Sequence, residues 1–412
     1  MRDTLGIILA GGQGNRLSPL TKDRAKPAVP FGGIYRIIDF TLSNCINSNL
    51  RQVYVLSQYK SSSLERHIRL GWNILSPDLG EFITCIPPQQ RVNNKWYQGT
   101  ADAIYQNLYN IRMENPRNIL ILSGDHIYKM DYGEMLNFHL EKSAALTIAA
   151  IEVPTAKARG FGIIEVDENF RVSGFQEKPD SPSSLPHDVA HSFASMGIYI
   201  FNAELLYKAL ENDSCDETSE HDFGKSIIPK LVAKNLPVYA YNFKDENKKE
   251  AKYWRDVGTI DAYWNANMDL VNVDPVFNLY DTYWPIRTYQ IQAPPAKTVF
   301  AQERPPEHEG HPPRIGITLD SMIAPGAIVS GGWVKHSIIS PNVKIHSYSR
   351  IENSVLFSQV EVGRYSRIKN TIIDKYVKIP RHTVIGENWE EDIKRFKISE
   401  GGIRVVPKGM VL

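Results

Sequence analysis

The N-terminal two thirds of the chain alternate short apolar runs with segments of helical spacing. The runs include "LGIILA", "VYVLSQ", "NILILSGD" and "LTIAAIEV", and they are rich in β-branched residues without strict alternation. Such runs are typical of strands buried on both faces of a parallel sheet. Between two of them, "GTADAIYQNLYNIRMENP" has helical spacing and stops at Pro116. Strands that alternate with helices predict an α/β doubly wound domain.

Towards the C-terminus, aliphatic residues recur every six positions. The runs are Ile317, Ile323 and Val329; Ile345 and Ile351; Val362 and Ile368; and Ile373, Ile379 and Ile385. A six-residue aliphatic repeat indicates a parallel β-helix, in which each short strand turns one aliphatic side chain toward a shared axis. The phase slips between the runs, which we interpret as insertions, and the length predicts only a few coils. Such a module more often packs subunits than performs chemistry.

A proline-rich segment separates the two patterns. Seven prolines lie between Pro285 and Pro313, without convincing periodicity, which indicates a linker or an extended connection. We therefore predict a first domain over residues 1–284, a connecting segment over 285–315 and a β-helix over 316–412. The connection contains "EHEGH", which is not the zinc motif H-E-x-x-H and is interpreted as a solvated loop.

Composition narrows the class of protein. A chain of 412 residues predicts two domains, and its net charge of +1 gives no broad attraction to nucleic acid or membranes. Cys45, Cys85 and Cys215 are widely spaced and lack metal-site spacing, as is typical of reduced thiols in a cytosolic protein. No stretch approaches a transmembrane span. The first strand is expected near Leu5, which predicts no signal peptide, although a transit peptide already removed is compatible with this sequence. We predict a cytoplasmic protein.

A glycine-rich loop follows the first apolar run. In "LAGGQGNRLSPLTKDRAKPAV", Gly11, Gly12 and Gly14 precede Arg16 and Lys26. The spacing matches neither a P-loop nor a dinucleotide-binding fingerprint. Glycines nevertheless let backbone N–H groups form an anion-binding nest, and a following helix N-terminus adds positive charge. The basic side chains would then meet phosphate oxygens. The alternative is a tight strand-to-helix turn with solvated basic residues.

Two aspartates lie in "LILSGDHIYKMDYGEM". Asp125 ends a buried strand at the sheet edge expected to carry the glycine loop, where it would hold a divalent cation against phosphate oxygens. The alternative for Asp125 is a strand-end turn residue. Asp131, with Glu134 three residues later, predicts the N-cap of the next helix in a capping box. A third aspartate, Asp256, lies in the short segment "YWRDVGT".

Two further segments suggest a sugar phosphate site. "WYQGTADAI" places two aromatic residues before a Gly-Thr turn, where they either wall a pocket or pack in the core. In "FQEKPD", Glu177 and Lys178 precede Pro179, and an irregular backbone before proline would let both reach one ligand. Lysine suits a phosphate and glutamate suits sugar hydroxyls, although such a pair is commonly a solvated surface feature. Together, these motifs predict Mg²⁺-dependent transfer between a nucleotide and a sugar phosphate.

The ordered set of motifs resembles one family over nearly the whole chain. Beside those quoted above, "FGGIYRIIDFTLSNCINS", "IPPQQR", "FGIIEVD" and "SFASMGIYIFNAE" occur in the family's order. The sequence resembles glucose-1-phosphate adenylyltransferases, also called ADP-glucose pyrophosphorylases, of the bacterial type. The resemblance implies a nucleotidyltransferase α/β domain followed by a left-handed parallel β-helix.

The resemblance also implies roles for individual residues. It assigns the nucleotide to Gly11, Gly12, Gly14, Gln89, Gln90 and Gly99, with one of the two glutamines at adenine. It assigns glucose 1-phosphate to Tyr97, Gly162, Glu177, Lys178 and Ser195. Arg16, Lys26 and Asp125 would be catalytic, with Lys26 neutralising the departing pyrophosphate. Asp125 and Asp256 would bind Mg²⁺. Gln58 and Trp96 would link an effector site to the substrate site.

The implied reaction joins ATP and glucose 1-phosphate into ADP-glucose, for glycogen synthesis, in a homotetramer that responds to a phosphorylated small molecule. One alternative is another sugar-nucleotide pyrophosphorylase that uses UTP, dTTP or GTP. A second is a non-catalytic regulatory subunit, whose mark would be loss of Asp125, Arg16 or Lys178; all three are present. A third is a β-helix acyltransferase, but His336, His346 and His382 show no partner pattern for it.

Overall fold

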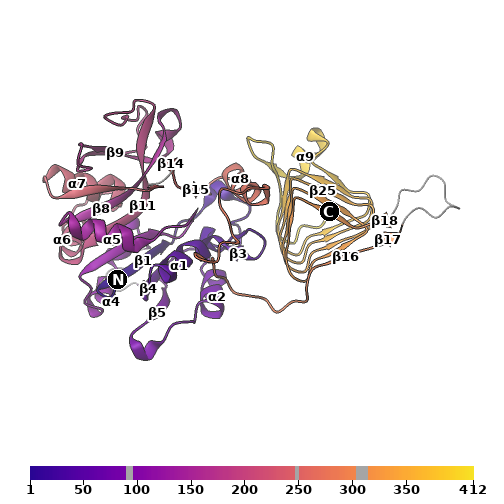
Figure 1. The fold of residues 1–412 in the computed structure, drawn as a ribbon, viewed down its shortest axis with the longest axis horizontal. Helices are drawn as coiled ribbons and strands as arrows, with labels where there is room; N and C mark the ends of the chain where they lie inside the picture. The colour runs from indigo at the N-terminus through magenta and orange to yellow at the C-terminus, as the bar shows by residue number, and fades with distance from the viewer. Residues whose placement is uncertain (90–95, 246–249, 303–313) are drawn as a thin grey trace.

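The computed structural model describes residues 1–89, 96–245, 250–302 and 314–412. It has two lobes (Figure 1): a mixed α/β lobe built from the N-terminal part of the chain, and a triangular coil of short strands built from the C-terminal part. The order of the two architectures is the one that the hydrophobic patterns predict.

A mixed sheet forms the centre of the first lobe. β1 runs parallel to both of its neighbours, β4 and β6, and β4 runs parallel to β5. All four apolar runs are strands, but β11 is inserted antiparallel between β6 and β8, so the fourth run does not extend the parallel set. The strands are β1 (Thr4–Ala10), β4 (Gln52–Ser57), β5 (Phe82–Ile86), β6 (Asn118–Ser123), β8 (Leu146–Pro154), β9 (Gly162–Val166), β10 (Val172–Glu177), β11 (His191–Asn202) and β12 (Val238–Asn242).

In the part of the chain that the structure describes, seven helices pack against this sheet, and an eighth, α8 (Ile260–Met268), lies at the junction with the second lobe. The seven are α1 (Ile37–Asn47), α2 (Ser62–Gly71), α3 (Thr100–Tyr105), α4 (Leu108–Met113), α5 (Tyr132–Glu141), α6 (Ala203–Ser214) and α7 (Ile228–Ala233). The predicted N-cap of α5 is confirmed, because Asp131 Oδ1 accepts the N–H of Gly133 at 2.7 Å. The predicted capping box is wrong, because Glu134 accepts a hydrogen bond from Tyr241 Oη at 3.2 Å instead of from the backbone of Asp131.

The helix predicted up to Pro116 is interrupted between α3 and α4. Asn107 lies at the break, and its side-chain amide donates to the carbonyl of Ala103 at 2.8 Å and to Tyr97 Oη at 3.0 Å. Asparagine side chains compete with the backbone in this way, which disfavours a continuous helix. The break thereby ties Tyr97 to the helix.

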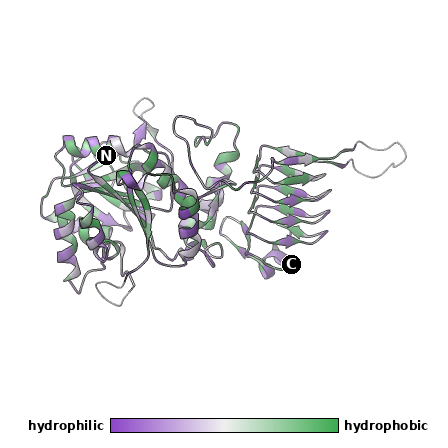
Figure 2. Ribbon diagram, turned by 90° about the horizontal axis from the view of Figure 1, so that it is seen from below, coloured by the Kyte–Doolittle hydropathy of each residue, from purple (hydrophilic) through white to green (hydrophobic). Residues whose placement is uncertain are grey.

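The second lobe is a left-handed parallel β-helix with three sheets, and Figure 2 shows its coils stacked side by side. Strands in register are mostly 17 residues apart, as in Lys344↔Glu361↔Lys378. The inward aliphatic positions therefore follow a spacing of six, six and five residues, as from Ile339 through Ile345 and Ile351 to Leu356, all of which are buried. Our interpretation of the phase slip as insertions is wrong, because the slip is a five-residue turn that recurs in each coil.

Each coil turns through residues with left-handed backbone. At the three corners these residues are His336, Asn353 and Asn370; Asn342, Gln359 and Tyr376; and Tyr348, Tyr365 and His382, with φ between 46° and 65°. For residues other than glycine this conformation is unfavourable, because the Cβ comes too close to the backbone. At the third corner the cost is offset by stacked rings, with centroids 4.9 Å and 5.0 Å apart.

The two lobes are joined by a shared core. Tyr263 of α8 packs edge-on against Phe357 of the β-helix, with ring centroids 6.5 Å apart. Arg24 forms a buried bidentate ion pair with Asp374, at 3.0 Å and 2.9 Å. The predicted connection also contributes a strand, because β16 (Lys297–Val299) pairs in parallel with β21 (Ile328–Ser330) of the β-helix.

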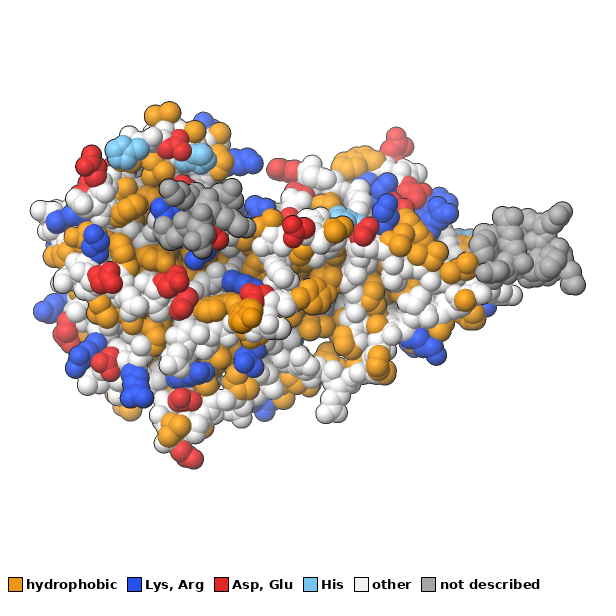
Figure 3. All heavy atoms as spheres, in the orientation of Figure 1, with side chains coloured by type: hydrophobic (Ala, Val, Ile, Leu, Met, Phe, Trp, Pro, Cys, Tyr) orange, Lys and Arg blue, Asp and Glu red, His pale blue; other side chains and the backbone are white. Residues whose placement is uncertain are grey.

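The charged side chains on the surface are distributed as expected for a chain of nearly zero net charge. On the face shown in Figure 3, acidic and basic side chains are interspersed over both lobes. The three cysteines are free. Among the helices of the described residues, none has the length and apolar character that crossing a membrane requires.

Candidate active site

A pocket of about 740 Å³ opens at the carboxyl ends of β1 and β6. Leu9 at the end of β1 is in register with Ser123 at the end of β6, so the glycine loop and Asp125 meet at one edge, as predicted. The predicted site residues that line this pocket are Gly11, Gly12, Gly14, Arg16, Lys26, Gln58, Tyr97, Gly99, Asp125, Gly162, Glu177, Lys178, Ser195 and Asp256.

Two glycines of the loop differ in what the structure requires of them. Gly14 has φ of 66°, and a Cβ there would lie 3.0 Å from Thr21 and 3.2 Å from Lys26. A Cβ at Gly12 would meet nothing within 4 Å, so the backbone there faces open space. The loop continues into a single 3₁₀ turn over Asn15–Leu17 rather than the helix that we expected, so a full helix dipole does not support the nest.

Lys26 lies between two carboxylates. Its Nζ is 2.7 Å from Asp125 Oδ2 and 3.1 Å from Asp256 Oδ1. Burial by itself would lower the pKa of Lys26, but Asp125 and Asp256 raise it above its usual value. Burial would likewise raise the pKa of Asp125, but Lys26, His126 and a hydrogen bond from Ser123 hold that pKa well below its usual range. The two carboxylates engage two of the three N–H donors of Lys26, which leaves one donor for the predicted contact with pyrophosphate.

The same carboxylates belong to a group that suits a metal ion. β7 (His126–Tyr128) pairs with β15 (Trp254–Asp256), and this register places His126 opposite Asp256. One ligand atom each from Asp125, His126 and Asp256 lie within 4.8 Å of one another. Carboxylate oxygens are preferred ligands of hard divalent cations. The arrangement thus fits a divalent metal site built from two strand ends.

The pocket is also lined by Glu177, which ends β10, and by Lys178, which follows it with φ of 48°. This positive φ confirms the predicted irregular backbone before Pro179. Lys178 Nζ contacts Glu177 Oε1 at 2.9 Å, and its side chain is 60% exposed. A Cβ at Gly162 would lie 2.9 Å from Glu177 Oε2, so glycine leaves room for the carboxylate.

Of the predicted residues that the structure describes, Gln89 and Trp96 are not in the pocket lining. Gln89 is exposed and donates to the carbonyl of Pro87 at 2.9 Å, and Gln90 lies outside the described residues. Trp96 stacks on Tyr59, with ring centroids 5.5 Å apart, and Tyr59 itself lines the pocket. Trp96 is therefore one side chain removed from the site.

Sequence reasoning missed several lining residues, among them His126, Asp222, Phe223 and Trp254. The indole N–H of Trp254 and Nδ1 of His126 are buried without a hydrogen-bond partner among the described residues. Trp254 precedes Asp256 by two residues, so alternation along the strand offered a signal. The "HDFG" segment at 221–224 has turn-forming composition, but nothing local connects it to the pocket.

Comparisons with known proteins agree with this geometry. A family model described as "Nucleotidyl transferase" matches residues 5–273, and one described as "GlmU-like, C-terminal hexapeptide" matches residues 294–406. A glucose-1-phosphate adenylyltransferase of Koribacter versatilis is 54% identical over 410 residues, covering 99% of this chain and 96% of the relative. Glucose-1-phosphate adenylyltransferase 2 of Vibrio parahaemolyticus is 55% identical, covering 99% of both chains.

The chain belongs to the glucose-1-phosphate adenylyltransferase family. Nucleotidyltransferases of this kind generally use a divalent metal, which the cluster of Asp125, His126 and Asp256 fits. Family membership favours adenylyl transfer over uridylyl, thymidylyl or guanylyl transfer. Arg16 and Lys178, whose loss would mark a regulatory subunit, both line the pocket with Asp125.

Proposed function

We propose that this protein transfers the adenylyl group of ATP to α-D-glucose 1-phosphate, forming ADP-glucose and pyrophosphate for glycogen synthesis. One observation carries the proposal: a single pocket joins the glycine loop and the Lys26–Asp125–Asp256 cluster to the Glu177–Lys178 pair. The first end suits a triphosphate with a cation, and the second suits a phosphorylated sugar.

The reaction needs no protein nucleophile. A phosphate oxygen of glucose 1-phosphate attacks the α-phosphorus of ATP in line, and a new P–O bond forms as the bond to pyrophosphate breaks. This oxygen is already ionised near neutral pH, so no base has to remove a proton. Catalysis then consists of positioning and of neutralising several negative charges that are brought together.

Each end of the pocket has a role in this scheme. The backbone of Gly11 to Gly14 and the exposed Arg16 bind the ATP phosphates, with Lys26 beside the leaving pyrophosphate. Asp125 and Asp256 hold Mg²⁺, which when bound neutralises charge on phosphate oxygens. Lys178 binds the sugar phosphate, and Glu177 accepts hydrogen bonds from sugar hydroxyls.

The nucleotide preference tests the proposal directly. Pyrophosphate release is measured with ATP, UTP, dTTP and GTP, each with and without glucose 1-phosphate and Mg²⁺. We expect ATP to exceed the other nucleotides by at least about 10²-fold in kcat/KM, because a wrong base leaves polar groups of the site unpaired. Comparable use of UTP would favour a uridylyltransferase. Pyrophosphate release in the absence of glucose 1-phosphate would contradict the proposal that this sugar phosphate is the acceptor.

Lys178→Ala tests the sugar phosphate end. Its partner is present in the ground state and the transition state alike, so KM for glucose 1-phosphate should rise about tenfold or more while KM for ATP changes little. Lys394→Ala removes another exposed lysine, which pairs with Glu391 on α9 (Trp389–Arg395) at 3.2 Å, and serves as the control. A selective loss of ATP affinity in the Lys178 variant would reverse the assignment.

The proposal includes regulation by a phosphorylated small molecule in a cytoplasmic homotetramer. In support of the effector, Arg24 and Arg36 both lie close enough to Lys375, at the junction of the lobes, to act on its charge, and Arg24 pairs with Asp374. Burial, Arg36 and Arg24 lower the pKa of Lys375 to about 8, against a rise due to Asp374. Three cations with one carboxylate among them suit an anion. This site is tested by measuring the initial rate of the reaction in the presence of inorganic phosphate and of a panel of sugar phosphates. A rate that none of these compounds changes would contradict regulation by a phosphorylated molecule.

A further inference from the structure

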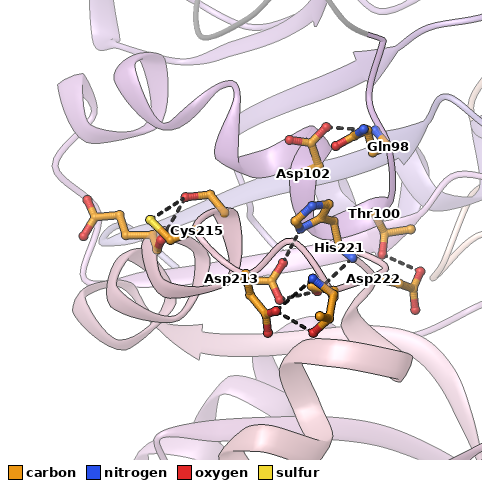
Figure 4. A network of polar contacts seen from close by, with 12 residues as sticks. Gln98, Thr100, Asp102, Asp213, Cys215, His221 and Asp222 are labelled. Atoms are coloured by element: carbon orange, nitrogen blue, oxygen red, sulfur yellow. Dashed lines mark hydrogen bonds and ion pairs between the residues drawn. The ribbon is translucent and has the colours of Figure 1, made fainter.

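A hydrogen-bond network at the N-terminus of α3 reaches the pocket but has no part in the reaction described above (Figure 4). Thr100 is the first residue of α3, and its hydroxyl donates to Asp222 Oδ2 at 2.9 Å. The same hydroxyl accepts the N–H of Phe223 at 3.1 Å. Thr100 thereby ties the helix that follows Tyr97 and Gly99 to a segment that is more than 100 residues away in the chain.

The second oxygen of Asp222 is also engaged. Asp222 Oδ1 accepts the N–H groups of Gly224 and Lys225 at 2.9 Å and 3.2 Å, and so caps the helical turn Phe223–Ile227. The carboxylate therefore has three hydrogen-bond donors and a defined orientation at the pocket wall. A group that is held on both oxygens is preorganised for a ligand.

This segment also borders the Glu177 carboxylate. A Cβ at Gly224 would lie 2.7 Å from Glu177 Oε2, and Gly162 approaches the same oxygen from another strand. Phe223, between Asp222 and Gly224, is buried against Tyr199 and Phe201, with ring centroids 5.7 Å apart in both pairs. A shift of the segment would therefore be transmitted to the carboxylate that faces the sugar end.

The network has a second anchor that does not use the Thr100 hydroxyl. The carbonyl of His221 accepts the N–H of Ala101 at 2.8 Å and of Asp102 at 3.3 Å, and a Cβ at Gly99 would collide with it. His221 Nδ1 is in turn 2.8 Å from the buried Asp213. These contacts hold the backbone of the segment against α3, so removal of the hydroxyl alone leaves the fold in place.

We propose that Thr100 is a positioning residue that sets affinity and selectivity for the sugar phosphate through Asp222 and the Gly224–Glu177 contact. The inference rests on the proposed function, because it names the substrate end of the same pocket. Thr100 acts on the sugar end although it follows Gly99, which the family resemblance assigns to the nucleotide. Its hydroxyl acts through Asp222 and the N–H of Phe223, to which it is hydrogen-bonded.

Thr100→Val is the decisive variant, because it keeps the shape and β-branching but removes the donor and acceptor. Losing a hydrogen bond to a charged group should raise KM and the calorimetric Kd for glucose 1-phosphate about tenfold, with ATP values within about twofold. The preference for glucose 1-phosphate over galactose 1-phosphate should fall. Thr100→Ser restores the hydroxyl and should return these values to near those of the unmodified protein.

Two comparisons separate positioning from a general structural effect. Thr383→Val removes a hydroxyl that donates to the carbonyl of Pro380 in the β-helix, and should leave both substrates unaffected. In a double-mutant cycle with Asp222→Asn, the double variant should lose little more affinity for glucose 1-phosphate than the more damaging of the two single variants. The inference would be overturned if the effects of the two substitutions on the Kd for glucose 1-phosphate multiplied fully. It would also be overturned if Thr100→Val weakened the binding of ATP and of glucose 1-phosphate equally. Absence of ADP-glucose formation by the unmodified protein would instead overturn the proposed function.

Discussion

Asp125→Asn is expected to lower kcat by about 10²-fold or more, the scale on which a lost electrostatic contact to the transition state acts. The substitution is nearly isosteric, so the fold should persist. It removes the charge that Lys26 contacts at 2.7 Å and leaves the amide as a weaker ligand for a divalent cation. Steady-state kinetics at saturating Mg²⁺ measure the effect, and circular dichroism checks the fold.

Asp131→Asn is the matched control for this variant. Asp131 lies six residues further along the chain and caps α5, a role that asparagine also fulfils. The control should retain near-normal kcat and stability. A folded Asp125→Asn enzyme with near-normal kcat would show that Asp125 does not hold the metal.

Asp374→Asn is expected to lower the free energy of unfolding by about 3–5 kcal/mol, because it leaves the Arg24 guanidinium buried without its counter-charge. The two side chains are only 6% and 2% exposed and meet through two hydrogen bonds across the lobes. The effect is read as a lower urea midpoint, both by far-ultraviolet circular dichroism and by tryptophan fluorescence, which reports on both lobes because Trp333 and Trp389 lie in the second.

Glu211→Gln provides the corresponding surface test. Glu211 pairs with Arg112, but both side chains are 48% exposed, so removing the charge should cost less than about 1 kcal/mol. The Arg24→Met, Asp374→Leu double variant removes both buried charges and should recover much of the stability lost by Asp374→Asn. Equal destabilisation by Asp374→Asn and Glu211→Gln would mean that water reaches the junction between the lobes.

Much of the architecture is encoded in short-range patterns. The apolar runs that became β1, β4, β6 and β8 are recognisable because a strand buried on both faces needs apolar residues at every position. The β-helix is recognisable from its inward aliphatic residues, which repeat with each turn of the coil. The N-cap at Asp131 depends on neighbours within three residues. Such features depend on residues near one another in the chain, so the amino-acid order alone predicts them.

Site residues were predicted where a motif marks them. Gly14 needs its positive φ because the loop turns there, and Asp125 lies two residues after the end of β6, a strand whose burial the sequence predicts. Most of the residues predicted from such motifs line one pocket in the structure, although the chemical roles of these residues remain predictions. By contrast, the five-residue turn of the β-helix was misread, because a slip in a one-dimensional pattern does not distinguish a shorter turn from an insertion.

Contacts between distant segments were decided only by the tertiary structure. Lys26 is separated from Asp125 by 99 positions and from Asp256 by 230, and no local pattern says that its ammonium lies between them. Likewise, Thr100 meets Asp222 across 122 positions. Periodicity records which side of an element is buried, whereas the partner of a polar side chain depends on how whole elements pack. The sequence by itself therefore determined the elements, the order of the lobes and the edge that carries the pocket, and tertiary packing decided which charges and hydroxyls meet inside it.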